Sequence, residues 1–373
     1  MILKTDCRFY RGDRPCAPNK QFGIVCTECT HYAPIEHKTL VIKLDAVGDV
    51  LRSTSILGAI KKELPTTSIT WVTRSNALAI FANNPNVDNL LAFESPETFQ
   101  TLLAQEYDLL IHADASPTSA PLASLIKAKT KRGFGLSSKG KVVPLTPEAE
   151  YWLEMGVFDA VKKANTLTYQ EIMHNIAGFP YEQSPIQIYL SEAEKKTTQQ
   201  FLNKIDTTKI VIGLNTGAGT KWELKQWTFA GYSDLIKRLL ELPNVEVVLY
   251  GGEDERERNQ QLKSQYPQVH DTGTENNLRG FFALIDACDI LVTGDTMALH
   301  AAAALQKYVV CLFGPTSSNE IEDYGLITKV LPELDCLVCY KPKCDFKPNC
   351  MESISTEVVL AAITELMQKI DKK

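Results

Sequence analysis

The sequence predicts an α/β fold built from two Rossmann-like, doubly wound domains that face a cleft, together with cysteine-rich segments that bind metal. Short apolar runs of strand length alternate with segments of helical spacing, and this alternation is typical of a parallel sheet covered by helices. The alternation begins near residue 39, gives way to a helical stretch at 149–177, and then starts again. The chain has 373 residues, which exceeds the size of one ordinary hydrophobic core.

The first domain is expected to span residues 39–183, after an irregular cysteine-rich segment at residues 1–38. Residues 179–185 contain two prolines and resemble a linker. The apolar runs that predict strands lie at residues 40–44, 68–73, 90–93, 109–112 and 132–134. Helical spacing marks residues 50–64, 77–82, 96–106 and 122–127.

The second domain is expected to span residues 184–352, where the same alternation returns. Its predicted strands lie at residues 210–214, 245–250, 290–293 and 308–313, and its predicted helices at 228–240, 254–266 and 278–287. A last helix, at about 356–369 within the segment 353–373, is expected to pack back toward the first domain.

Composition narrows the class of protein. The formal net charge is −6, which argues against bulk binding to nucleic acid. No apolar run reaches the length of a membrane span, and residues 1–8 lack the apolar core of a signal peptide. We therefore expect a cytoplasmic protein, whose thiols stay reduced.

Eight of the ten cysteines fall into two groups of four, and we expect each group to bind metal. Each group contains a Cys-x2-Cys pair, and four thiolates complete a tetrahedral site. Zinc, iron and an iron–sulfur cluster all fit this chemistry, with free thiols as the alternative. The role is expected to be structural, because no catalytic zinc pattern is present. The first group is Cys7, Cys16, Cys26 and Cys29, and the second, in the loop at 335–351, is Cys336, Cys339, Cys344 and Cys350.

Asp49 is the candidate general base. The pair Gly48-Asp49 lies where the first predicted strand meets its helix, and ligands of doubly wound sheets bind at this carboxyl edge. A carboxylate there can take a proton from an attacking hydroxyl. The alternative is that Asp49 only stabilises the start of its helix.

Two further strand ends carry candidate donor-binding residues. The loop 215–221 contains Thr216, Gly217, Thr220 and Lys221, and its glycines allow close approach of a ligand. Lys221 and the nearby Lys225 supply positive charge for a diphosphate, although either is equally well explained as a solvated surface charge. Glu255 follows another strand, where a carboxylate accepts hydrogen bonds from ribose or begins a helix with favourable charge.

The third strand end, in the segment 290–305, is the strongest sign of a phosphate-bearing ligand. A buried strand, the turn Gly294-Asp295-Thr296 and a small-residue helix follow one another directly. The free N–H groups and the dipole at the start of that helix favour an anion. Met297 begins the helix, and His300 shares a face with Thr296 and either contacts a ligand or packs internally.

These motifs, taken in order, make the chain resemble glycosyltransferase family 9, the ADP-heptose heptosyltransferases of lipopolysaccharide synthesis. The resemblance covers roughly residues 39–370. It rests on the segment 43–54, Lys225-Gln-Trp227, Gly251-Gly-x-x-Glu255, Gly294-Asp-Thr296 with His300, and the segment 312–316. It implies a GT-B fold and transfer of heptose with inversion and without a catalytic metal.

The resemblance also implies individual roles. Asp49 matches the general base, Lys225 a lysine that binds the donor phosphates, and Glu255 the carboxylate that holds the ribose. Thr220 and Lys221 fall in the adjacent donor loop, and Asp295 and Thr296 match the turn that meets diphosphate and sugar. The implied donor is ADP-heptose, and the implied acceptor is the lipopolysaccharide core or another surface glycan, reached at the inner face of the inner membrane.

Two departures from the family pattern keep alternatives open. Met297 stands where many members have glycine, so another nucleotide sugar is an alternative donor. The N-terminal cysteine segment is also outside the pattern of the best-known members. Some relatives, the autotransporter heptosyltransferases, carry cysteine-bound iron and modify proteins, so a protein acceptor is a second alternative. A non-catalytic nucleotide-sugar-binding GT-B protein and a homo-oligomer held by the cysteine segments complete the hypotheses.

Overall fold

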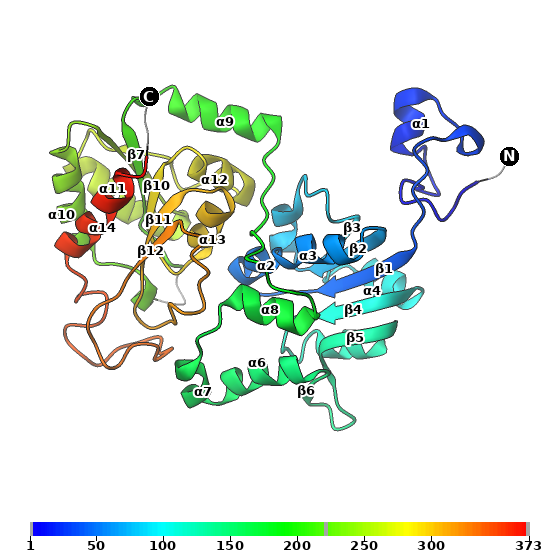
Figure 1. Ribbon diagram of the computed structural model, residues 1–373. Helices are drawn as coiled ribbons and strands as arrows, with labels where there is room; N and C mark the ends of the chain where they lie inside the picture. The colour runs from blue at the N-terminus through cyan, green and yellow to red at the C-terminus, as the bar shows by residue number, and fades with distance from the viewer. Residues whose placement is uncertain (1–2, 220–222, 371–373) are drawn as a thin grey trace. The chain divides into compact units, whose positions relative to one another are not determined.

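The computed structural model describes residues 3–219 and 223–370 and divides the chain into two compact units (Figure 1). The first unit contains Met1–Asp45, Ser55–Leu153 and Ile172–Ser184, and the second contains Ala46–Thr54, Glu154–Glu171 and Pro185–Lys373. The sequence pattern assigns Ala46–Thr54 and most of Glu154–Glu171 to the first domain, so their grouping with the second unit is a difference from the expected boundaries.

The first unit is built on a six-stranded sheet of order β3-β2-β1-β4-β5-β6. The first five strands pair in parallel, and β6 runs antiparallel to β5. Apolar runs without polar interruption form the central strands, because both faces of a parallel sheet are covered by helices. The strands are β1 (His37–Ile42), β2 (Thr67–Thr73), β3 (Asn89–Ala92), β4 (Glu106–His112), β5 (Lys127–Leu136) and β6 (Val142–Pro144).

The strand β5 is longer than expected, because the lysine-rich part of the chain that precedes residue 132 also joins the sheet. Lys127, Lys129 and Lys131 alternate with Ala128 and Thr130, which is the period of a strand, and Lys127 and Lys129 are largely exposed. Lys127 and Lys129 form ion pairs with acidic residues of β4. An alternating run of charged residues can therefore form a strand although it is not apolar.

Helices and 3-10 turns connect these strands. The expected helix at 50–64 is two helices, α2 (Val47–Ser53) and α3 (Ile56–Glu63), and the expected helix at 77–82 is the 3-10 segment η2 (Ser75–Phe81). The cysteine-rich segment contains α1 (Ala17–Phe22) and the 3-10 turn η1 (Cys26–Glu28). The remaining helices up to residue 177 are α4 (Pro96–Leu103), α5 (Ala120–Leu125), α6 (Pro147–Val157), α7 (Asp159–Ala164) and α8 (Tyr169–Ala177).

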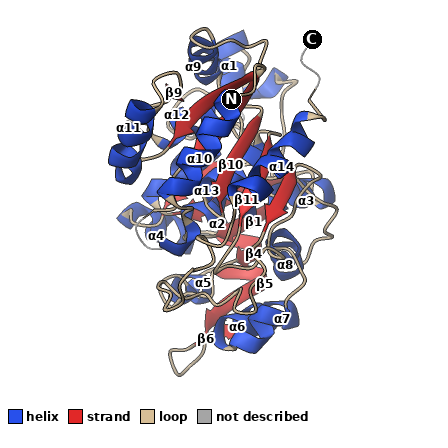
Figure 2. Cartoon of the chain, turned by 90° about the vertical axis from the view of Figure 1, so that its left-hand side faces the viewer, coloured by secondary structure: helices blue, strands red, loops and turns tan. Residues whose placement is uncertain are grey.

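The second unit contains a six-stranded parallel sheet of order β12-β11-β10-β7-β8-β9. The short edge strands β9 and β12 were not expected from the sequence, because neither is a long apolar run. Figure 2 shows the strands of both units with helices packed beside them. The strands are β7 (Ile210–Asn215), β8 (Val245–Tyr250), β9 (His270–Asp271), β10 (Ile290–Gly294), β11 (Tyr308–Leu312) and β12 (Ile327–Val330).

Helices of this unit begin where the sequence supplies N-terminal caps. Ser191 begins α9 (Glu192–Leu202) through a capping box with Glu194, and Thr228 and Asn277 cap α10 (Phe229–Leu240) and α12 (Leu278–Ile285). The other elements are α11 (Arg256–Gln265), α13 (Met297–Ala304), and the 3-10 turns η3 (Glu223–Lys225) and η4 (Glu253–Glu255).

The last helix, α14 (Thr356–Met367), contributes its apolar face to the core of the second unit. Val359, Ala362, Ile363 and Leu366 pack in one cluster with β7, β10 and α10 residues. The apolar stripe of α14 is thus buried in the core of the second unit, and its expected return toward the first domain stays a prediction. Within the described residues, no helix combines the length and the apolar character needed to cross a membrane.

Candidate active site

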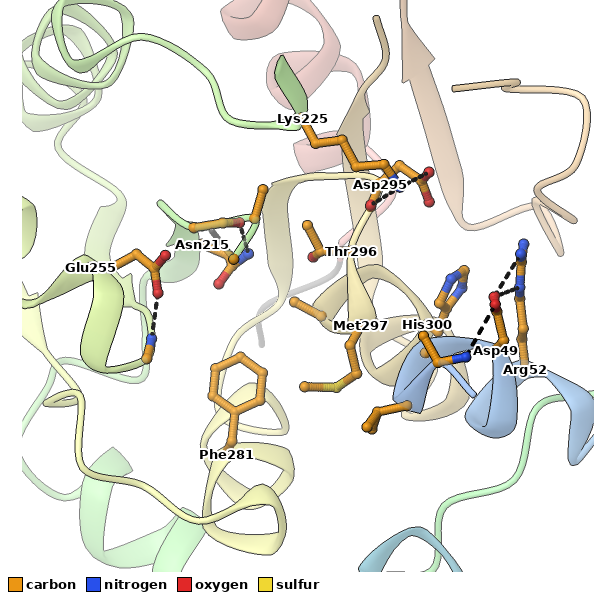
Figure 3. Close-up of a pocket in the computed structure, with 18 residues that line it drawn as sticks. Asp49, Arg52, Asn215, Lys225, Glu255, Phe281, Asp295, Thr296, Met297 and His300 are labelled. Carbon is orange, nitrogen blue, oxygen red and sulfur yellow. Dashed lines mark hydrogen bonds and ion pairs between the residues drawn. The ribbon is translucent and has the colours of Figure 1, made fainter. Parts of the chain in front are cut away.

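The carboxyl ends of β7, β8 and β10 meet at a cavity of about 550 Å3, and the first turns of α2 and α13 complete it (Figure 3). Every lining residue belongs to the second unit. The volume lies in the range of small-molecule sites. The lining residues are Ala46, Val47, Gly48, Asp49, Arg52, Asn215, Gly217, Ala218, Gly219, Lys225, Gly252, Glu255, Phe281, Asp295, Thr296, Met297, Ala298 and His300.

The start of α13 is the anion-binding feature of this cavity. Thr296 is the N-cap residue with extended backbone, and its side chain makes no capping hydrogen bond to the helix. Met297 and Ala298 follow in the first turn and line the cavity. Because the first N–H groups of a helix have no partner within it and carry the positive end of the dipole, this turn suits a diphosphate.

Lys225 and Asp295 form a partly buried pair beside that turn. The Lys225 Nζ atom donates to Asp295 Oδ2 at 2.8 Å and to its carbonyl oxygen at 3.1 Å. Thr316 Oγ1 also donates to Asp295 Oδ2, at 2.8 Å. Burial alone would raise the pKa of Asp295, but Lys225, His300 and Arg52 hold it well below its usual range. Asp295 is therefore a fixed negative charge that positions the lysine.

Asp49 lies in the first turn of α2, where Arg52 holds it. The Arg52 Nε and Nη2 atoms lie 3.0 and 2.8 Å from Asp49 Oδ1. The other oxygen, Oδ2, accepts a long bond of 3.4 Å from the Ala46 N–H. The Arg52 guanidinium stacks 3.6 Å from the centre of the Tyr169 ring, so the arginine itself is fixed. The carboxylate is thus held in one orientation at the cavity.

Close packing of α2 on α13 brings Asp49 next to the anion-binding turn. A Cβ atom added to Gly48 would lie 3.4 Å from His300 Cδ2 and 3.6 Å from Met297 Cα. His300 is buried, and burial followed by the charge of Arg52 lowers its pKa to about 3. The imidazole is therefore neutral at pH 7, and it lies between Asp49 and Asp295 as a polar packing residue.

Glu255 lies at the far side of the cavity from Asp49 in the view of Figure 3. Its Oε2 atom accepts from the Gly252 N–H at 2.8 Å, and burial raises its pKa above the usual value. A Cβ atom on Gly217 would lie only 2.1 Å from Glu255 Cδ, so the loop after β7 can pass the carboxylate only with glycine. Phe281 of α12 forms the apolar wall between Glu255 and Met297.

The structure brings eight of the eleven expected catalytic and donor-binding residues together in one cavity. Asp49, Gly217, Lys225, Glu255, Asp295, Thr296, Met297 and His300 line the one cavity. Thr216 does not, because its side chain is fully buried and its hydroxyl donates to Asn259 Oδ1 at 2.6 Å. The Thr216 side chain therefore helps to hold the loop, and the expected role of Thr216 in donor binding stays a prediction. Thr220 and Lys221 lie outside the described residues.

Three lining residues were missed in the sequence. Arg52 lies one helical turn after Asp49, a spacing that places both on one face and could have identified it. Asn215 ends β7 and donates to Gly217 O at 3.1 Å and Thr293 Oγ1 at 3.0 Å, so it is a polar residue at a strand end like the others. Phe281 reaches the cavity from α12, and nothing in its local sequence marks it.

The cysteines gather as the spacing predicts, although no metal site is preformed. Cys7, Cys16, Cys26 and Cys29 line one cavity of the first unit, and Cys336, Cys339, Cys344 and Cys350 line one cavity of the second. All eight are free thiols. Among residues 3–219 and 223–370, no three or more Cys, His, Asp or Glu residues are already grouped so as to hold a metal ion.

Comparison with known proteins supports the expected α/β fold with two sheets, of GT-B type. A glycosyl transferase family 9 protein from Veillonella parvula DSM 2008 superposes with a TM-score of 0.71 at 20% identity, over 90% of this chain and 98% of that one. TibC from enterotoxigenic E. coli, an iron-containing dodecameric glycosyltransferase, superposes with a TM-score of 0.57 at 13% identity, over 90% of this chain and 77% of that one.

Sequence relatives give the same family. Lipopolysaccharide heptosyltransferase 2 of Escherichia coli (strain K12) is 26% identical over 305 residues, which cover 76% of this chain and 84% of that protein. The family described as glycosyltransferase family 9 (heptosyltransferase) matches residues 97–349, well over half of the chain. With the strand-end cavity and this match together, the chain belongs to glycosyltransferase family 9 and is a glycosyltransferase.

Proposed function

We propose that this enzyme transfers heptose from ADP-heptose, with inversion, to a saccharide of the lipopolysaccharide core or another surface glycan, and that Asp49 is its general base. The observation that carries the proposal is that one cavity is lined by a carboxylate on α2, a lysine on η3, the N-terminus of α13 and a second carboxylate on η4. An enzyme that joins a hydroxyl to a nucleotide-activated sugar needs these groups together.

In the proposed complex the donor runs from Glu255 to the start of α13. Glu255 accepts hydrogen bonds from the ribose, and its hydrogen bond from Gly252 keeps it in place. Lys225 and the first N–H groups of α13 receive the diphosphate. Support for ADP-heptose comes from relatives named as lipopolysaccharide heptosyltransferases and from TibC, which has been solved in complex with ADP-D-beta-D-heptose.

The transfer would proceed as one in-line displacement at the anomeric carbon. The acceptor oxygen forms the new bond to that carbon, the bond to the diphosphate oxygen breaks, and Asp49 takes the hydroxyl proton. Negative charge then grows on the departing ADP, where Lys225 and the α13 dipole stabilise it.

The test is Asp49→Asn with two measurements, transfer and ADP binding. We expect turnover to fall by about 10²–10⁴-fold, the usual contribution of a general base, while ADP affinity stays within about twofold because Asp49 touches no donor group in the proposal. Asp159→Asn is the matched control, since Asp159 is also a first-turn carboxylate of a short helix in the second unit but lies outside the cavity. Unchanged turnover in Asp49→Asn would refute the base assignment, and retained ADP binding without any transfer by the wild type would indicate a non-catalytic binder.

A different sugar on the donor is the second candidate, and Met297 favours it. The methionine lies between Thr296 and Phe281 in the cavity wall, so the space beside the diphosphate is narrower and more apolar than glycine would leave it (Figure 3). A panel of ADP-, GDP- and UDP-sugars, with saccharide and protein acceptors, would rank donors and acceptors by the nucleotide released. Faster release from another nucleotide sugar would replace ADP-heptose in the proposal.

We further propose that each cysteine group holds a structural metal, zinc, iron or an iron–sulfur cluster. The fit rests on four free thiols around each cavity, and thiolates are the ligands that these metals share. TibC, which is iron-containing and dodecameric, supports a metal and an oligomer. Elemental analysis and light scattering test both, and a metal-free monomer would contradict them.

With a lipid-linked acceptor, the enzyme would act in the cytoplasm at the inner face of the inner membrane. Binding to vesicles that carry this acceptor would test the proposed location.

A further inference from the structure

The segment that contains the second cysteine group is long and irregular, yet it lies against the donor site. Residues 331–355 connect β12 to α14 without a helix or strand. Irregular connections of this length are uncommon in compact domains unless they serve a function or are held by something else. Figure 1 shows this loop, in orange, beside β12 and below α14. Its four cysteines line one cavity, and a metal bound by their thiolates would hold the loop in place.

The walls of the cysteine cavity and of the donor site are connected through neighbouring residues. Leu224 and Gly314 line the cysteine cavity. Leu224 directly precedes Lys225, and Gly314 lies two residues before Thr316, which donates to Asp295. A Cβ atom on Gly314 would lie 2.4 Å from Cys350 Sγ, so this thiol packs directly on the backbone of the 314–317 turn. A displacement of Cys350 toward Gly314 would therefore displace that turn.

Hydrogen bonds link the turn to the backbone on both sides of Cys339. The Val338 N–H donates to Gly314 O at 3.4 Å, and the Tyr340 N–H donates to Pro315 O at 2.8 Å. The Ser317 N–H donates to the Tyr340 hydroxyl at 3.3 Å, and that hydroxyl donates to Glu320 Oε1 at 2.6 Å. Cys339 therefore lies on a backbone that runs along the whole 314–317 turn.

The two residues that flank Cys339 adopt an unfavourable backbone conformation. Val338 has a φ of 59° and Tyr340 a φ of 51°, so both neighbours of the cysteine adopt the left-handed region. Branched and bulky residues rarely adopt it, and such conformations persist only where surrounding interactions impose them. The hydrogen bonds to Gly314 and Pro315 supply part of this constraint, and a metal on the Cys339 thiolate would supply more.

We propose that a thiolate-bound metal centre at Cys336, Cys339, Cys344 and Cys350 positions Lys225 and the Thr316–Asp295 contact, so that its occupancy sets the affinity for the donor nucleotide. The inference rests on the proposed function for the identity of that nucleotide. No three of these thiols already form a metal site within the described residues. Binding a metal must therefore draw them together and carry the 314–317 turn with them. The metal takes no part in the transfer step.

The experiment compares full-length wild type, Cys344→Ser and the matched variant Cys16→Ser from the other cysteine group. Elemental analysis measures bound metal, calorimetry measures ADP affinity, and absorption spectra separate colourless zinc from iron or an iron–sulfur cluster. We expect Cys344→Ser to lose metal and to bind ADP about tenfold more weakly, a typical coupling between sites. Cys16→Ser should lose metal without a change in ADP affinity. Near-UV circular dichroism identifies any variant that has merely unfolded, and wild type depleted of metal with a chelator then provides the second comparison.

Several outcomes would overturn the proposal. Loss of metal from Cys344→Ser or from chelated wild type with unchanged ADP affinity would show that the metal does not position the donor site. Equal weakening in Cys16→Ser would show a general effect of metal loss. Metal-free wild type that binds ADP tightly would also refute it and leave the proposed function intact. Wild type with metal but no ADP binding would instead remove the proposed function, and this inference with it.

Discussion

At the scale of single residues, the site depends on charges that are paired inside the protein before any ligand binds. Lys225 and Asp295 are each less than one-fifth exposed and face each other at 2.8 Å. Arg52 and Asp49 form the second pair, at 2.8 Å. In each pair one partner fixes the geometry of the other, so that a diphosphate and an acceptor hydroxyl meet groups that are already oriented.

Lys225→Met tests the first pair. The substitution keeps the apolar stem and removes the cation, so the diphosphate loses a charged hydrogen bond and also meets the unneutralised carboxylate of Asp295. We expect ADP affinity to fall by about 10–100-fold, since such a bond contributes about 1.5–3 kcal/mol. Titration calorimetry measures it, with Lys237→Met on the exposed side of α10 as control. Equal affinities for the two variants would exclude Lys225 as a phosphate ligand.

His300 predicts how stability depends on pH. Its pKa in the folded protein is about 3, lowered by burial and then by Arg52, whereas the unfolded chain has the ordinary value of about 6.5. Between these values the unfolded state binds a proton that the folded state does not, so stability is lost as pH falls below 6.5. Between pH 7 and pH 5, we expect the unfolding free energy of His300→Asn to fall less than that of the wild type. The difference between the two losses should be on the order of 1–2 kcal/mol.

Urea unfolding at several pH values measures this difference. His31→Asn is the control, because His31 is an exposed histidine of the first unit. Parallel pH profiles of wild type and His300→Asn would mean that the imidazole is not buried in its neutral form.

At the scale of elements, the packing of α14 can be tested with two adjacent residues. Val359 is fully buried in the second unit's core, whereas Val358 is 52% exposed. Val359→Ala leaves a cavity, and we expect it to lower the unfolding free energy by about 2 kcal/mol. Val358→Ala should change it by less than about 0.5 kcal/mol. Similar losses for both would mean that α14 does not use this face in the core, and urea titration is sufficient to decide.

Sequence reasoning succeeded where an element's period and its end residues carry the information. The strands that end at Asn215, Tyr250 and Gly294 are apolar runs, and the residues after them are the candidates that line the cavity. Sequence reasoning was less successful where the place of a side chain depends on a neighbouring element or residue. Phe281 lines the cavity only because α12 packs beside the sheet, and the Thr216 side chain does not line it, because its hydroxyl donates a hydrogen bond to Asn259 Oδ1. The two short edge strands depend on partners rather than on their own composition.

At the scale of the whole molecule, the grouping of α2 with the second unit has a measurable result. Ala46–Thr54 is separated by more than a hundred residues from the rest of the cavity wall, yet Gly48 packs against Met297 and His300. We expect ADP to slow amide hydrogen exchange both in α13 and in α2, while β2 and β3 of the first unit exchange as before. Exchange followed by mass spectrometry would measure it. If ADP slows amide exchange only in residues beyond 185, α2 does not form part of the ADP-binding site.

The lysines of β5 have a consequence for how the protein behaves in a crowded cell. Beyond Phe134 the strand pairs with β6, but before it, in the part of the chain that the structure describes, no further strand pairs with its outer side. Such an open edge invites a strand of another molecule, and repeated addition leads to aggregates. The exposed ammonium groups of Lys127 and Lys129 would have to lose hydration before a strand of another molecule could pair there, so this edge of the sheet disfavours self-association.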